Sequence, residues 1–142
     1  MQSSASLDVA EYEQFMHMRL RTDLNDACSL FQALTHEQEE YRALVQNIQL
    51  LVKGEIGNLK TLMPLGKEQG FQVQAEVPVT EFIYVKIGLG FHVQCTLLEA
   101  SDIAKNKEQQ LQAQIDRQTD TISKIRARMI LMQESIEAMQ AA

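Results

Sequence analysis

Residues 71–96 read FQVQAEVPVTEFIYVKIGLGFHVQCT. Apolar and polar side chains alternate along this stretch with a period of two, which is typical of β-strands that cover a core with one face. Gly88 and Gly90 interrupt the alternation, and glycine readily adopts the positive φ of a tight turn. We therefore predict two β-hairpins, at roughly 62–76 and 82–96.

The predicted hairpins carry more apolar surface than two strands can bury alone, and their outer edges are unpaired. We expect the remainder of the chain to be a stiff rod that points away, so that the hairpins recruit other subunits. The alternative is that the rod folds back over the strands. The predicted subunit-interface residues are the apolar strand positions Phe71, Val73, Ile83, Val85, Ile87, Phe91 and Val93.

The sequence on both sides of the hairpins follows a seven-residue apolar period. The N-terminal grid starts at Ala10 and keeps its phase to Leu62, and the C-terminal grid runs from Leu97 to Met139. A period of 3.5 residues per turn is typical of a left-handed coiled coil. The predicted fold is a single α+β domain over 1–142, with a coiled-coil helix over 8–62, two β-hairpins over 63–96 and a second coiled-coil helix over 97–140.

Polar residues within the apolar grid predict how the two helices align. Two long helices in one chain pair most simply with each other, and the hairpin segment lets the second helix return antiparallel to the first. A buried glutamine without a partner costs a few kcal/mol. We therefore predict that Gln38 faces Gln118 and that Glu55 faces Ser101; this alignment leaves Glu108 without a polar partner.

Composition narrows the class of protein. The chain has 19 acidic and 13 basic residues and a formal net charge of −6, which argues against nucleic acid or an anionic membrane as a partner. Its apolar runs are short, so we expect neither a signal peptide nor a transmembrane helix, and we expect a cytoplasmic protein. Cys28 and Cys95 are expected to be reduced thiols.

The sequence gives little support to catalysis. His17, His36 and His92 lie on three separate predicted segments without cysteine or carboxylate residues at metal-ligand spacing. The glycines at 88 and 90 lie between two strands, whereas a phosphate-binding loop precedes a helix. We expect no enzyme activity, no metal and no cofactor.

Several short motifs occur in a fixed order along the chain. They are Tyr12-Glu13-x-Phe15, Leu20, Asp23-Leu24, Leu65-Gly66, Val77-Pro78-x-Thr80, Ile83-Tyr84-Val85, Gly88-x-Gly90-Phe91 and Thr96-Leu97-x-Glu99-Ala100. Their order, between two long heptad segments, resembles the α-type subunits of prefoldin over nearly the whole chain.

The resemblance implies a heterohexameric co-chaperone of two α-type and four β-type subunits. In that family the hairpins form β-barrels and the coiled coils hold unfolded clients without ATP. The nearest prefoldin-like branch further implies a larger chaperone assembly, a transcription cofactor role, and a nuclear as well as a cytoplasmic location. The alternative function is a coiled-coil scaffold or transcription adaptor without holdase activity.

Methionines are the candidate client-binding residues. Met16 and Met18 near the start of the first helix, and Met132 and Met139 near the end of the second, would converge at the open end of an antiparallel pair. Flexible thioether side chains suit surfaces that accept varied apolar partners. For Met129, Met132 and Met139 the alternative is an ordinary place in the apolar seam.

Three basic residues, Lys124, Arg126 and Arg128, cluster on the second helix. The favoured interpretation is a solvated helix face, and the alternative is contact with an acidic partner.

Overall fold

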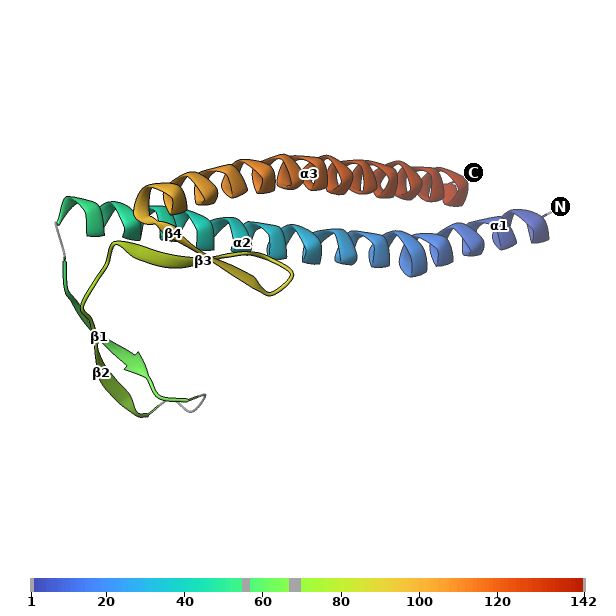
Figure 1. Cartoon of the computed structure of the whole chain (residues 1–142). Coiled ribbons are helices and arrows are strands. Elements are labelled where there is room, and N and C mark those ends of the chain that lie inside the picture. The colour runs from blue at the N-terminus through green and yellow to red at the C-terminus, as the bar shows by residue number, and fades with distance from the viewer. Residues whose placement is uncertain (1, 55–56, 67–69, 142) are drawn as a thin grey trace. The chain divides into compact units, whose positions relative to one another are not determined.

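The structure, a computed structural model, describes residues 2–54, 57–66 and 70–141 (Figure 1). The side chains of residues 2–8 and of His17 lie outside this description. Two compact units make up the chain: one combines Met1–Gln38 with Gln110–Ala142, and the other is Glu39–Gln109.

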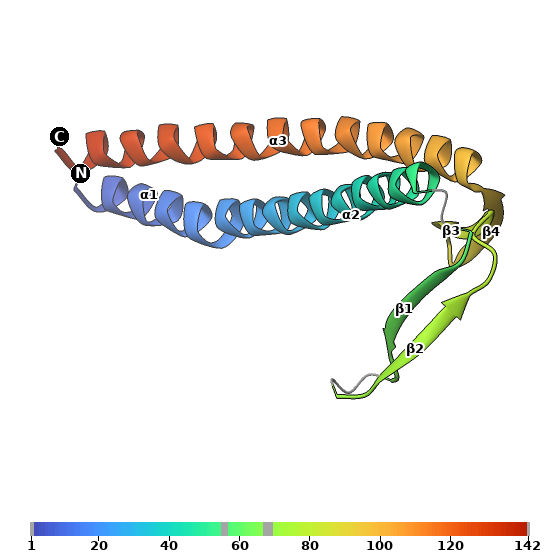
Figure 2. The same cartoon turned by 90° about the vertical axis from the view of Figure 1, so that its left-hand side faces the viewer.

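The first unit is an antiparallel helix pair. The N-terminal member of the pair consists of α1 (Gln2–Phe15), the π-helical turn η1 (Met16–Leu20) and the beginning of α2 (Arg21–Lys53). The C-terminal part of α3 (Leu97–Ala141) runs beside them, so that the start of α1 and the end of α3 lie together (Figures 1 and 2). The buried seam residues of this unit include Leu20, Ala27, Leu111, Ile115, Ile122 and Ile136. The predicted antiparallel coiled coil is confirmed.

The π-helical turn shifts the phase of the N-terminal seam by one residue. In this turn, Met16–Leu20, the backbone hydrogen bond closes onto a carbonyl five residues earlier, which accommodates one extra residue. Val9 and Met16 are therefore half-buried, and Ala10 is exposed. The predicted seam position of Ala10 is wrong, and that of His17 lies outside the described side chains.

Hydrogen bonds show that the helix alignment differs from the predicted one. Gln38 is buried, and its Nε2 donates to Oε1 of Gln112 at 2.8 Å. Gln118 instead donates from Nε2 to the carbonyl oxygen of Ala27 at 3.1 Å. The predicted Gln38–Gln118 layer is wrong, because each glutamine finds a separate partner in a different alignment. Glu55 lies outside the described residues.

The second unit contains both hairpins. Strand β1 (Leu59–Pro64) pairs antiparallel with β2 (Gln72–Val77), and β3 (Phe82–Gly88) pairs antiparallel with β4 (Phe91–Thr96). They form two separate two-stranded sheets. The two predicted β-hairpins are confirmed.

The N-terminal helix is shorter than predicted. Helix α2 ends at Lys53 and β1 begins at Leu59, whereas the heptad pattern predicted a helix to residue 62. Gly54 and Gly57 each cost about 1 kcal/mol relative to alanine in a helix. Beyond them Leu59 pairs with Val77, so cross-strand pairing replaces the helical seam.

Helix α3 begins with a capping box, a reciprocal pair of side chain to backbone bonds. The backbone amide and Oγ1 of Thr96 both donate to Oε2 of Glu99 at 2.9 Å. In return the amide of Glu99 donates to Oγ1 of Thr96 at 3.3 Å. The bond from the Thr96 amide, and to a smaller extent the bond from its hydroxyl, hold the pKa of Glu99 below its usual value.

The second unit has a small core with one residue from each neighbouring element. Ile48 of α2, Val85 of β3, Cys95 of β4 and Ala100 of α3 are buried together. The methyl group of Ala100 leaves room for the hairpin to approach α3 closely. The expectation of a rod that points away is therefore wrong for β3–β4, and the alternative, in which helices cover one face of the strands, is correct for this hairpin.

Candidate functional site

The β1–β2 hairpin has one apolar and one polar face. Met63 lies opposite Val73 and Leu59 lies opposite Val77, so these four share a face. The other face carries Lys60, Leu62, Gln72, Gln74 and Glu76. Met63, Val73 and Val77 are exposed. An uncovered apolar sheet face of this kind is typical of interaction surfaces.

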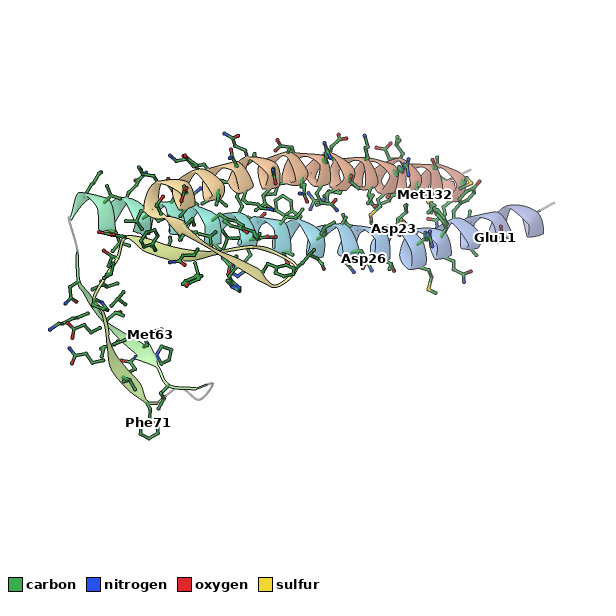
Figure 3. The ribbon with its side chains drawn as sticks, in the orientation of Figure 1. Glu11, Asp23, Asp26, Met63, Phe71 and Met132 are labelled. Carbon is green, nitrogen blue, oxygen red and sulfur yellow. The ribbon has the colours of Figure 1, made fainter. Side chains whose placement is uncertain are left out.

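Phe71 extends this surface. It precedes β2, is 76% exposed, and points away from the strands at the end of the hairpin (Figure 3). Its carbonyl oxygen accepts a hydrogen bond from the amide of Leu65 at 2.9 Å, which anchors the backbone there. The exposed ring therefore projects from a hydrogen-bonded segment.

The β3–β4 hairpin is covered only in part. Its inner positions face the helices, but Ile87, Phe91 and Val93 near the turn remain exposed. At the turn itself Leu89 has a positive φ of 50° and an exposed side chain. Each described sheet has only two strands, so every strand has an outer edge without a strand partner.

The structure divides the predicted interface residues into two groups. Phe71, Val73, Ile87, Phe91 and Val93 are exposed, and their role at an interface stays a prediction. Ile83 is half-buried against the core of the second unit, and Val85 is only 2% exposed within it. Val85 is therefore corrected to a core residue. Alternation identifies residues that share a face, but it does not say which part of the face the chain's own helices cover.

A groove runs along one side of the helix pair in the first unit. We call it the arginine groove, and its volume is about 710 Å³. Its apolar and charged lining residues are Met16, Leu24, Met129, Ile130 and Ile136 together with Arg21, Arg126, Glu13 and Glu137.

A second set of hollows lies on the other side of the seam, and we call it the aromatic groove. Three adjoining hollows of about 450, 310 and 230 Å³ all include Met132. Met132 and Glu11, both labelled in Figure 3, come from the two facing helices. The apolar lining residues are Tyr12, Phe15, Leu20, Leu131, Met132 and Met139.

The predicted client-binding methionines do not form one cluster. Met16 lines the arginine groove, whereas Met132 and Met139 line the aromatic groove. Met18 is 70% exposed and lines neither. Sequence reasoning missed Tyr12 and Phe15 as lining residues. Their signal was present, because both are large apolar residues outside the heptad seam.

Charged side chains of the described region differ in whether they are paired. Lys124 Nζ lies 2.6 Å from Asp120 Oδ2, and Arg42 Nη2 lies 2.9 Å from Glu108 Oε1. Arg42 thus supplies the partner that Glu108 lacked in the predicted alignment. Arg126 forms no ion pair with any residue that the structure describes.

The described residues offer no cluster of metal ligands. No group of three histidine, cysteine or carboxylate side chains lies close enough there to hold a metal ion. Burial, and then the nearby charge of Glu99, raises the pKa of the Cys95 thiol and disfavours the thiolate. None of the described helices is long and apolar enough to cross a membrane.

The fold and its surfaces define a coiled-coil protein whose two hairpins expose apolar side chains. Residues 23–142 match the family described as prefoldin subunit, and the chain belongs to this family. Membership implies assembly with other prefoldin-type subunits.

Three relatives extend the similarity over most of the chain. The Protein UXT homolog of Dictyostelium discoideum is 35% identical over 129 residues, which cover 91% of this chain and 79% of the relative. The Protein UXT homolog of Nematostella vectensis is 29% identical over 134 residues, and Protein UXT of Bos taurus is 29% identical over 138 residues. Each of these two comparisons covers 93% of this chain and 83% of the relative.

Proposed function

We propose that the chain is an α-type subunit of a prefoldin or prefoldin-like heterohexamer that binds unfolded or assembling client proteins without ATP. The observation that carries this proposal is the apolar face of the β1–β2 hairpin, which no described part of the chain covers. Strands from other prefoldin-type subunits would bury that face and the exposed residues near the β3–β4 turn, and would pair with the free outer edges.

Client binding is assigned to the two grooves of the first unit. Both combine thioether and aliphatic side chains on a helix pair, and such side chains adapt to different apolar partners. Holding a client requires contact area and no bond chemistry, so we propose a binding protein and not an enzyme. We place it in the cytoplasm, with a nuclear fraction if it joins a larger chaperone assembly.

The assembly surface is tested by Phe91→Asp, with Leu50→Asp as the matched control. Phe91 is 66% exposed on the β3–β4 hairpin, and Leu50 is 64% exposed on α2. Neither change buries a charge in the free chain. Native mass spectrometry of the co-expressed complex should show assembly for Leu50→Asp and its loss for Phe91→Asp. Equal assembly of both variants would contradict the proposed surface.

Client binding is tested by measuring how well the complex delays aggregation of an unfolded protein. The double variant Met16→Ser/Met132→Ser removes one thioether from each groove, and Met18→Ser makes the same substitution outside both. Protection should fall in the double variant and persist in the control. A complex that gives no protection even in the wild type supports the adaptor alternative and overturns the holdase proposal.

A further inference from the structure

The arginine groove separates its charges along its length. Arg21 and Arg126 lie toward the end of the groove that contains Leu24, whereas Glu13 and Glu137 lie toward the chain termini. On α3, Arg126 and Glu137 are eleven residues apart, which corresponds to about 16 Å at a rise of about 1.5 Å per residue. The groove therefore has a positive and a negative end.

The two ends of the groove differ in their hydrogen bonding within the described structure. Glu13 Oε1 accepts a bond from Gln140 Nε2 at 3.2 Å, and Glu137 Oε1 accepts one from Gln133 Nε2 at 3.2 Å. Arg21 and Arg126 form neither an ion pair nor a side-chain hydrogen bond with any described residue. In a chain with a net charge of −6, these two guanidinium groups are positive charges that form no ion pair with a described residue.

Apolar side chains from both helices line the groove together with the charged residues. Met16 and Leu24 come from the N-terminal helices, and Met129 and Ile130 come from α3. Ile130 lies outside the seam, and its side chain is exposed. Two packed helices present a groove into which a third helix can lay an apolar stripe at spacings of three and four residues.

We propose that the arginine groove binds an amphipathic helix of a partner protein whose acidic side chains lie over Arg21 and Arg126. The inference deepens the proposed function, on which it rests, because it names the class of segment held by this part of the subunit. The helix has three to four turns, an apolar stripe over the groove floor, and carboxylates at one end. Charge complementarity selects this occupant, because an extended apolar segment would gain nothing from two unpaired guanidinium groups.

The test uses three synthetic peptides of about 15 residues with one shared apolar stripe. They carry glutamate, glutamine or lysine at the positions meant to lie over the arginines. Binding to the full chain, within the complex in which it purifies, is measured by fluorescence anisotropy at low and at high salt. Circular dichroism of each bound peptide reports whether it becomes helical.

The groove variant is Arg21→Glu/Arg126→Glu, and the matched control is Arg19→Glu/Lys124→Glu. The control makes the same charge change at exposed positions of η1 and α3 that do not line the groove. We expect the glutamate peptide to bind helically and to lose about tenfold or more in affinity with the groove variant but not with the control. The lysine peptide should bind the groove variant better than it binds the wild type.

Equal affinity of the three peptides for the wild type would overturn the inference and indicate an uncharged or extended occupant. Equal losses in the groove and control variants, or no saturable binding, would also overturn it. A second copy of the chain as occupant would appear as self-association in analytical ultracentrifugation that the groove variant abolishes while no peptide binds. Aggregation protection is measured in parallel, so a complex that protects clients without peptide preference refutes this inference and leaves the proposed function intact.

Discussion

Replacing Val85 by alanine tests whether the β3–β4 hairpin is held by the chain's own helices. Val85 is 2% exposed and packs with Ile48 and Ala100, whereas Val93, its direct cross-strand partner, is 40% exposed. Val85→Ala and Val93→Ala each remove two carbon atoms, at directly paired positions of one β-ladder. Val93→Ala is therefore a matched control for Val85→Ala.

The expected magnitudes follow from burial. Two buried carbons are worth about 0.8 kcal/mol each, and the cavity left behind brings the cost of Val85→Ala to about 2 kcal/mol. Val93 has lost only part of its contact with water, so Val93→Ala should cost about 1 kcal/mol or less without a closed cavity. These costs correspond to amide hydrogen exchange that is about thirtyfold faster for Val85→Ala and about fivefold faster for Val93→Ala.

Amide hydrogen exchange of β3 and β4 in the unassembled chain measures this difference. Ladder amides should exchange about thirtyfold faster after Val85→Ala, and the increase should extend to the first turns of α3, which begins at Leu97. Tyr41, whose Oη donates to the carbonyl oxygen of Lys86 at 3.2 Å, should lose that contact when the hairpin detaches. Equal acceleration by the two variants would refute a hairpin docked on the helices.

Three further predictions concern the coil and the cap of α3. Gln38→Leu should raise the free energy of unfolding by about 1 kcal/mol, and with it the midpoint of thermal unfolding. The reason is that leucine fills the seam and the exposed Gln112 can bond to water; a lower midpoint would contradict this. Arg42→Ala should cost about 0.2–1 kcal/mol in urea unfolding at low salt by removing the Arg42–Glu108 ion pair, and the cost should shrink in 1 M NaCl. Because the folded-state pKa of Glu99 is lowered, its carboxylate stabilises the fold above the unfolded pKa of about 4.3, and this contribution is lost as pH falls through the folded value. Glu99→Gln should therefore flatten the acid limb of the stability curve, and an unchanged acid limb would refute the cap's contribution.

The elements themselves were largely predictable because they depend on near neighbours. A period of two places Val73 and Val93 in strands, and a period of seven places Leu111 and Ile122 in a helical seam, whatever the rest of the chain does. The end of α2 was missed because Leu59 is apolar and suits either a helical seam or a strand. Only its pairing with β2 distinguishes the two.

The candidate site was less predictable because exposure depends on what covers a residue. Phe91 and Val85 have the same apolar character in the sequence, yet one is exposed and the other is in a core. The grooves depend in addition on the π-helical turn, which moves Met16 into the seam region of the helix pair. The heptad seam did not reveal that turn, because Ala10 and Leu20 both fit a continued heptad.

The sequence by itself determined that this protein has two long heptad helices and two β-hairpins, since hydrophobic period is a property of consecutive residues. The tertiary structure alone decided that Gln38 bonds to Gln112, that Val85 and Ala100 are buried in one core, and that Arg21 and Arg126 line the same groove. A heptad repeat specifies which stripe of a helix is buried but is compatible with many axial offsets of its partner. The offset is chosen by contacts between residues far apart in the chain, and those contacts exist only once the helices and hairpins have packed.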